Sequence, residues 1–121
     1  MFLHINTTSH DLIELKLVDG EGTEIAKKEI KVNRDQAEKL LPAIDKILKD
    51  QDLTIQSLEK IIVKNGSGGF SSLRIGIVTA NTLAYALGIE VEDDLGNFKK
   101  TDNLQIVEPK YDREASVTLK K

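Results

Sequence analysis

The chain of 121 residues has the length of one domain, and 40% hydrophobic with 31% charged residues is typical of a globular protein. Its 17 basic and 20 acidic residues give a net charge of −3, which argues against a protein that binds nucleic acid alone through a concentrated basic surface. Cysteine is absent, which excludes disulfides, and no signal peptide or membrane-spanning stretch is recognisable, so we expect a cytoplasmic protein.

The first third of the sequence predicts three strands. Residues 2–6 are short and mostly apolar, as in a buried strand. Residues 11–18 alternate between apolar and charged side chains, which indicates a half-exposed strand. Asp19-Gly20 is a hairpin signal, and residues 23–32 alternate as an antiparallel edge strand does.

A helix is predicted next, with Asn33 as its N-cap and its end near Asp50. Its apolar positions cover an arc of roughly 160°, wider than a one-sided stripe. Pro42 falls toward the polar side, where a bend is best tolerated. A short helical turn is expected over 54–58, and residues 60–64 predict a buried strand parallel to the first.

A second helix is predicted from about Ser71 to Leu87, ended by Gly88. Residues 89–91 predict a short strand, and 92–103 a polar loop with room for a hairpin. Residues 104–107 predict a last strand, after which a charged tail follows. Three strands, a helix, a strand, a helix and a strand together predict an α/β fold: a mixed sheet with helices packed on it.

A glycine-rich loop connects the fourth predicted strand to the second helix. Gly66, Gly68 and Gly69 allow a tight turn, and a helix N-terminus favours an anion. The loop is not a Walker motif, because no Lys-Ser or Lys-Thr follows its last glycine at the required place. Two interpretations stay open, a phosphate-binding loop and a structural turn with packing glycines, and the turn is favoured.

The second helix is apolar on two sides. Leu73, Ile77, Ala80, Ala84 and Leu87 form one stripe, and a second, uncharged stripe contains Ile75, Thr79, Thr82 and Ala86. Arg74 is the only charge between Ser71 and Leu87. A helix without a polar face is normally covered on both sides. Either the first helix completes this cover or the two helices share a patch that docks on another protein.

The sequence gives only weak evidence for a catalytic site. Arg74 can hold an anion or brace the turn, and His4 and His10 have no carboxylate cluster that would predict a zinc site. Ser71 and Ser72 lack the His–Asp partners of a hydrolase. A metal-dependent nuclease is conceivable from three carboxylates, Asp11, Glu14 and Asp19, but the first strand offers Asn6 where a metal needs an aspartate. A ribonuclease H-like nuclease or a stand-alone ATPase is therefore the enzymatic alternative.

Several runs of residues resemble the TsaB (YeaZ) family, the non-catalytic partner in bacterial synthesis of threonylcarbamoyladenosine in tRNA. The opening strand, Leu3 to Ser9, is similar to the family's first strand, with Asn6 in place of its aspartate. The run from Gln36 to Pro42 is similar to a pattern in its first helix. The most specific run, Gly66 to Gly76, is similar to the family's glycine-rich hallmark, and residues 108–113 are similar to its C-terminal motif.

The resemblance implies one RNase H-like, actin-like (ASKHA) half-domain. Residues 1–121 would form a single unit with its core over about 1–91, a polar loop over 92–103 and a last strand and tail over 104–121. Most of the family's second half-domain would be missing. Because actin-like proteins hold nucleotide between two halves, we expect no cofactor and no metal in this chain alone, with ATP or ADP only at an interface with a partner.

The resemblance also implies a scaffold that binds and activates the catalytic subunit TsaD, touches tRNA only indirectly, and can pair with itself through the same helices. The residues expected at the partner interface are Gln36, Leu40, Ile44, Ile47, Ala80, Leu83, Ala84 and Leu87. Those expected to form the glycine loop and its surroundings are Gly66, Gly68, Gly69, Phe70, Arg74 and Gly76. A divergent homologue that docks on a different partner is the remaining alternative.

Overall fold

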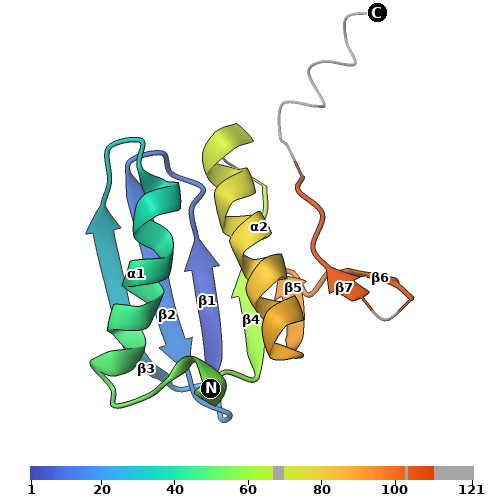
Figure 1. Ribbon diagram of the computed structural model, residues 1–121, viewed down its shortest axis with the longest axis horizontal. Helices are drawn as coiled ribbons and strands as arrows, with labels where there is room; N and C mark the ends of the chain where they lie inside the picture. The colour runs from blue at the N-terminus through green and yellow to red at the C-terminus, as the bar shows by residue number, and fades with distance from the viewer. Residues whose placement is uncertain (67–69, 103, 111–121) are drawn as a thin grey trace, which may run out of the picture.

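A five-stranded mixed sheet in the order β3-β2-β1-β4-β5 forms the centre of the molecule (Figure 1). The strands are β1 (Phe2–Asn6), β2 (Leu12–Val18), β3 (Glu24–Lys31), β4 (Lys60–Val63) and β5 (Glu90–Asp93). β1, β2 and β3 are antiparallel neighbours, whereas β4 runs parallel to β1, and β5 parallel to β4. The predicted α/β class and the parallel fourth strand are confirmed.

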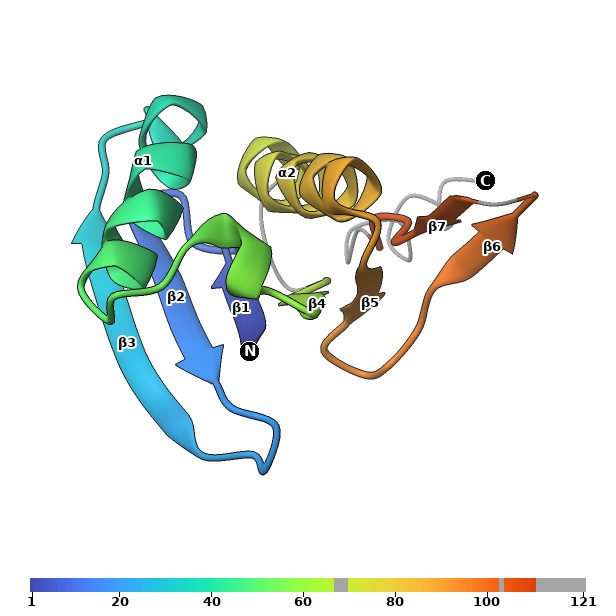
Figure 2. The same ribbon diagram turned by 60° about the horizontal axis from the view of Figure 1, so that its bottom comes forward.

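The computed structural model describes residues 1–66, 70–102 and 104–110, with the backbone alone at position 70. Two helices, α1 (Gln36–Lys49) and α2 (Phe70–Leu87), lie on the same face of the sheet (Figure 2). A short 3-10 turn, η1 (Ile55–Ser57), leads from α1 into β4. None of the helices in the described part of the chain is both long and apolar enough to cross a membrane.

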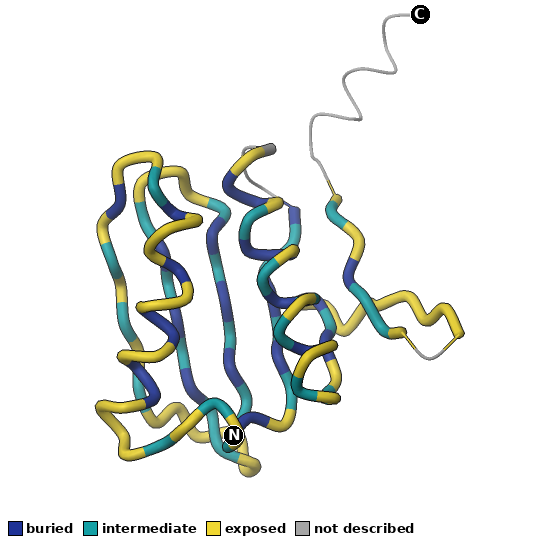
Figure 3. The backbone as a smooth tube through the Cα atoms, in the orientation of Figure 1, coloured by how far each residue is buried: buried dark blue, intermediate teal, exposed yellow. Residues whose placement is uncertain are grey.

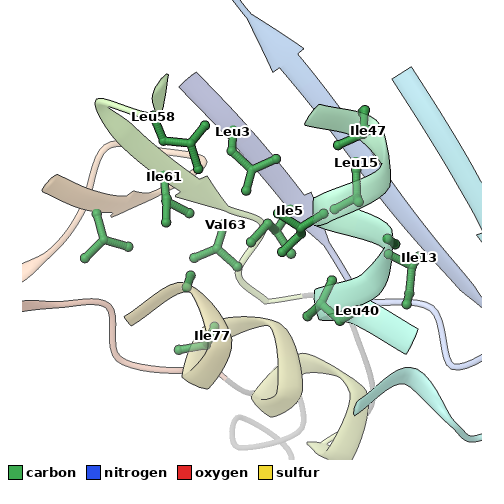
Figure 4. Close-up of a cluster of buried hydrophobic side chains, with 14 of the residues drawn as sticks. Leu3, Ile5, Ile13, Leu15, Leu40, Ile47, Leu58, Ile61, Val63 and Ile77 are labelled. Atoms are coloured by element: carbon green, nitrogen blue, oxygen red, sulfur yellow. The ribbon is translucent and has the colours of Figure 1, made fainter. Parts of the chain in front are cut away.

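The hydrophobic core fills the space between the sheet and the two helices (Figure 4). Alternation along β1, β2 and β4 turns every second side chain toward the helices, and Ile5, Leu15 and Val63 there are almost fully buried. Burying a side chain of this size contributes about 1.5–3 kcal/mol. Figure 4 shows Leu40 and Ile47 of α1 and Ile77 of α2 meeting these strand residues.

The hairpin between β2 and β3 forms where the sequence predicts it. The carboxylate of Asp19 accepts hydrogen bonds from the backbone N–H groups of Glu21 and Thr23, both at 2.9 Å. Gly22 follows with φ of 86°, a conformation that favours glycine. The side chain of Asp19 and the freedom of Gly22 therefore explain the tight reversal.

The start of α1 differs from the prediction. The helix begins at Gln36 with Asp35 as its N-cap, and Asn33 lies outside it. Arg34 has φ of 64°, so the chain is left-handed between Asn33 and the helix. The backbone N–H of Asn33 instead donates to the carboxylate of Asp35 at 2.8 Å. Pro42 lies inside α1 on its exposed side, as predicted.

The segment predicted as a polar loop, 92–103, contains more strand than expected. β5 continues to Asp93 because its backbone pairs with β4 through Ile62 and Val63. The side chain of Asp93 is buried and accepts hydrogen bonds from the N–H groups of Leu95 and Asn97. A hairpin then forms from β6 (Lys99–Thr101) and β7 (Leu104–Ile106), the hairpin for which the prediction left room.

Two asparagines hold the segment that follows β7. Asn81 of α2 donates from Nδ2 to the carbonyl of Val107 at 3.0 Å and accepts the Val107 N–H at 2.9 Å. Asn65 donates to the Glu108 carbonyl and accepts the Lys110 N–H, both at 2.8 Å. Residues 107–110 are therefore fixed beside α2 and the end of β4.

Candidate docking face on the two helices

Most of the residues predicted at a partner interface lie in the core. Six are buried by the protein itself: Gln36, Leu40, Ile44, Ile47, Ala80 and Ala84. Leu83 and Leu87 are partly buried and pack against the core. The expectation that the six form an accessible patch is therefore wrong. The physical reason is that this stripe of each helix faces the sheet.

Many residues on the two helices are exposed or half-buried (Figure 3), and among them is a different set of uncharged side chains. Leu41 is 52% exposed, Val78 54% and Tyr85 74%, which is high for side chains of this size. We call the following residues the docking face, because all are exposed or half-exposed and uncharged: Ala37, Leu41, Ile75, Val78, Thr79, Thr82, Tyr85 and Ala86. The second stripe predicted on α2 is contained in this set.

A shallow hollow of about 620 Å³ lies within this surface. Its lining comes from α1 through Ala37 and from α2 through Ser71, Arg74, Ile75, Val78 and Thr79. Arg74 is exposed and is the only charged side chain of this lining. The hollow is therefore an apolar depression between two neighbouring helices with one cation at its border.

The turn between β1 and β2 positions the beginnings of both helices. Gln36 at the start of α1 donates from Nε2 to the carbonyl of His10 at 2.6 Å. Thr7 donates from Oγ1 to the carbonyl of Ser72, in the first turn of α2, at 2.5 Å. Gln36 and Thr7 are both buried, so these hydrogen bonds form away from water. Gln36, predicted at a partner interface, is thus an internal brace.

Gly76 allows α2 to approach this turn closely. A Cβ atom at position 76 would overlap Oγ1 of Thr7 and lie 3.3 Å from its Cγ2. Gly76 therefore belongs to the helix and serves helix-to-turn packing. The close contact with Thr7 therefore explains why this position, which belongs to the run similar to the TsaB family, holds a glycine.

Replacing Gly76 with alanine should destabilise the protein by about 1–3 kcal/mol, because the added methyl group forces α2 away from Thr7. Urea unfolding would measure the loss. Gly20→Ala is the matched control, since nothing lies within 4 Å of the added atom there. In the Thr7→Ala background the penalty of Gly76→Ala should shrink, and equal penalties in both backgrounds would contradict the contact.

Gly66 is the part of the glycine loop that lies within the described residues. Gly66 is buried and has φ of 80°, which fits the predicted tight turn. Gly68 and Gly69 lie outside the described residues, and Phe70 begins the backbone of α2. Ser72 Oγ is buried and has no hydrogen-bond partner among the described residues, whereas the Ser72 carbonyl accepts a hydrogen bond from Thr7. The predicted phosphate-binding interpretation of the loop stays a prediction.

The carboxylates considered for a nuclease do not gather. Asp11 and Asp19 lie at opposite ends of β2, and Asp19 is used by its turn. Hydrogen bonding to the Ser9 hydroxyl lowers the pKa of exposed Asp11. Glu14 instead lies beside Asn6, whose Nδ2 is 3.4 Å from its Oε1. Among the described residues, no group of three His, Asp or Glu side chains could hold a metal ion.

Sequence comparison relates this chain to tRNA-modification proteins. A family model described as TsaD, tRNA N6-adenosine threonylcarbamoyltransferase, matches residues 28–92. The tRNA threonylcarbamoyladenosine biosynthesis protein TsaB of Bacillus subtilis is 35% identical over 71 residues, 59% of this chain and 31% of that protein. An uncharacterised protein of Mycobacterium tuberculosis is 40% identical over 58 residues, 48% of this chain and 28% of its own length.

Solved structures give the same result for the fold. YeaZ from Pseudomonas aeruginosa superposes with a TM-score of 0.68 at 25% identity, covering 76% of this chain and 42% of that protein. A protein described as similar to peptidase YeaZ has a TM-score of 0.69, also at 25% identity, covering 76% of this chain and 41% of its own. This chain thus spans about a third of the curated relatives and less than half of these structures.

Proposed function

Since this chain belongs to the TsaD family, as a TsaB/YeaZ-type member with the actin-like α/β fold, we propose that it is a non-catalytic subunit in threonylcarbamoyladenosine modification of tRNA. In this proposal it binds and activates a TsaD-type catalytic subunit. Its contribution is a rigid pair of helices that holds the partner in an active form. Contact with tRNA would be indirect, through that partner.

The observation that carries the proposal is the docking face. Eight uncharged positions on α1 and α2 remain exposed or half-exposed after the protein has built its own core. Their layout, two adjacent helices with a hollow between them, suits an apolar helix of a partner laid into a groove. Apolar side chains that stay accessible on such a surface, here the exposed Val78 and the half-buried Ile75, are the usual anchors of an interface.

The arrangement of polar groups favours a binding role over catalysis. Asn6 accepts hydrogen bonds from the backbone N–H and the hydroxyl of Thr8 at 3.0 and 2.7 Å, so its carbonyl oxygen is used by the turn. Glu14 is the carboxylate beside Asn6, and Asp11 accepts a hydrogen bond from the hydroxyl of Ser9. We propose that the isolated chain binds no nucleotide and that any ATP or ADP site requires a second subunit.

Calorimetry with the TsaD-type subunit of the same organism tests this function. We expect saturable binding, together with stimulation of threonylcarbamoyl transfer to tRNA when this chain is added to that subunit. No heat of binding and no stimulation would contradict the proposal. ATP titrated into the chain alone should give no heat, and binding there would instead support a stand-alone ATPase.

The same surface could also pair with a second copy of this chain, which a separate experiment can distinguish from binding to the TsaD-type subunit. We propose that the docking face also allows a homodimer, because a two-fold pair would bury the same exposed residues on both copies. Sedimentation equilibrium measures it directly. A strict monomer at high concentration would contradict the homodimer while leaving the TsaD-type partner as a separate question.

A further inference from the structure

The face of the sheet opposite the helices carries charged side chains that neutralise one another across strands. We call this the open sheet face. Lys60 Nζ on β4 lies 3.7 Å from a carboxylate oxygen of Glu90 and 3.3 Å from one of Glu92. The same ammonium group is 5.5 Å from the centre of the Phe2 ring on β1. These contacts shield the apolar part of a surface that neither α1 nor α2 covers (Figure 2).

A hollow of about 190 Å³ opens on this face, over β1 and β2. Side chains from four neighbouring strands contribute to its lining, among them His4, Glu14, Lys16, Lys27 and Ile62. The register supports this grouping, because His4 pairs with Lys16 on one side and with Ile62 on the other. A cavity of this size is smaller than the range of about 300–1,000 Å³ for drug-sized ligands, so its ligand is a small group.

The lining of the hollow carries three ammonium groups and two carboxylates, which is an excess of one positive charge. Of its carboxylates, Glu14 accepts a hydrogen bond from Asn6, and Asp94 is 3.3 Å from Lys64 Nζ and accepts the Asn65 N–H. Lys27 lies 3.8 Å from Glu29 on its own strand. Lys16 has no ion pair within the described part of the chain. Glu14 has no ion pair there either, so the excess positive charge of the lining comes from Lys27, whose partner Glu29 is not a lining residue.

His4 can supply a hydrogen bond there without adding a second charge. Burial lowers the pKa of the His4 imidazole, and the nearby ammonium of Lys16 lowers it further. The ring is therefore neutral near pH 7, with one nitrogen as donor and one as acceptor. A neutral donor beside a lysine is a suitable environment for an oxygen-rich anion.

We propose that this hollow binds a phosphate group, held by the ammonium of Lys16, with Lys27 as a second cation and the ring of His4 as a hydrogen-bond donor. Lysine is a common point-charge partner of phosphate. The phosphate is either free or the end of a larger molecule that extends over the open sheet face. The site is separate from the docking face, so its test does not depend on partner binding.

Nuclear magnetic resonance of the isotope-labelled full chain tests the site. Titration with inorganic phosphate at constant ionic strength should shift the amide signals of His4, Lys16 and Ile62 along a saturable curve. Glycerol phosphate in a second arm distinguishes the sources. Binding tighter than that of inorganic phosphate indicates a larger phosphorylated ligand, and equal binding indicates the free anion. Shifts that do not saturate, or that sodium chloride reproduces, would overturn the proposal.

Two substitutions make the test specific. Lys16→Gln should weaken phosphate binding about tenfold, the effect of losing one charge-assisted contact. Lys60→Gln removes the same charge from the same face outside the hollow, and should change the affinity less than about twofold. Equal losses in both variants would overturn the site in favour of general charge attraction. If Lys16→Gln fails to fold, Lys27→Gln serves in its place, with a smaller expected loss.

Discussion

Replacing Val78 with arginine is expected to weaken binding to the TsaD-type subunit by about thirtyfold or more, as loss of an interface hot spot does. Val78 is 54% exposed on the outer side of α2 and lines the hollow between the helices. A guanidinium group placed there would lose its water when the partner docks, and removing a charge from water costs free energy. Because the position faces solvent in the free protein, its stability should change by less than about 0.5 kcal/mol.

Calorimetry of the variant with the same partner measures this effect, and a thermal melt checks the fold. Gln56→Arg is the matched control, since Gln56 is exposed in η1 and outside both helices. That variant should bind as the unmodified chain does. An unchanged affinity of a folded Val78→Arg variant would reject the docking face, whatever the family of the protein.

The strands could be predicted well from the sequence because each has a simple local signal. Alternation of Ile13, Leu15 and Leu17 with charged neighbours fixes both the strand and the side that faces the core. The Asp19 turn is equally local, since the bonds that form it lie within four residues. β5 extends past its predicted end because Glu92 and Asp93 pair with β4.

The orientation of α2 could not be predicted in the same way. Its apolar residues occur on two sides, so the sequence identifies two candidate surfaces without telling which one meets the sheet. The structure assigns Ala80 and Ala84 to the core and leaves Val78 and Thr82 outside. Most of the side chains predicted for a docking patch therefore lie in the core, and the docking face proposed here lies on the outer sides of the same two helices. Which of the two stripes is buried depends on tertiary packing, and local periodicity does not predict it.

Long-range side-chain contacts were also invisible in the sequence. Nothing near Asn81 predicts that it binds the backbone of Val107, or near Gln36 that it reaches the carbonyl of His10. The hollow on the open sheet face could not be predicted for the same reason, because its lining combines residues from several different strands. The misplaced N-cap, by contrast, is a local error: the left-handed conformation of Arg34 separates Asn33 from the helix.

Replacing Ala84 with arginine should unfold the protein, in contrast to Val78→Arg. Ala84 is only 1% exposed and belongs to the stripe of α2 that faces the sheet. An arginine there must either bury an unpaired charge or push the helix outward, at a cost of more than about 4 kcal/mol. That is a large part of the roughly 5–15 kcal/mol by which domains of this kind are stable.

Circular dichroism during a thermal melt measures the effect, with Ala86→Arg as the matched control two residues along the same helix. Ala86 is exposed, so its variant should melt close to the unmodified protein, while Ala84→Arg should show no cooperative transition. If Ala84→Arg melted normally and lost only partner binding, Ala84 would lie on an accessible surface. The buried stripe and the docking face assigned to α2 would then have to be exchanged.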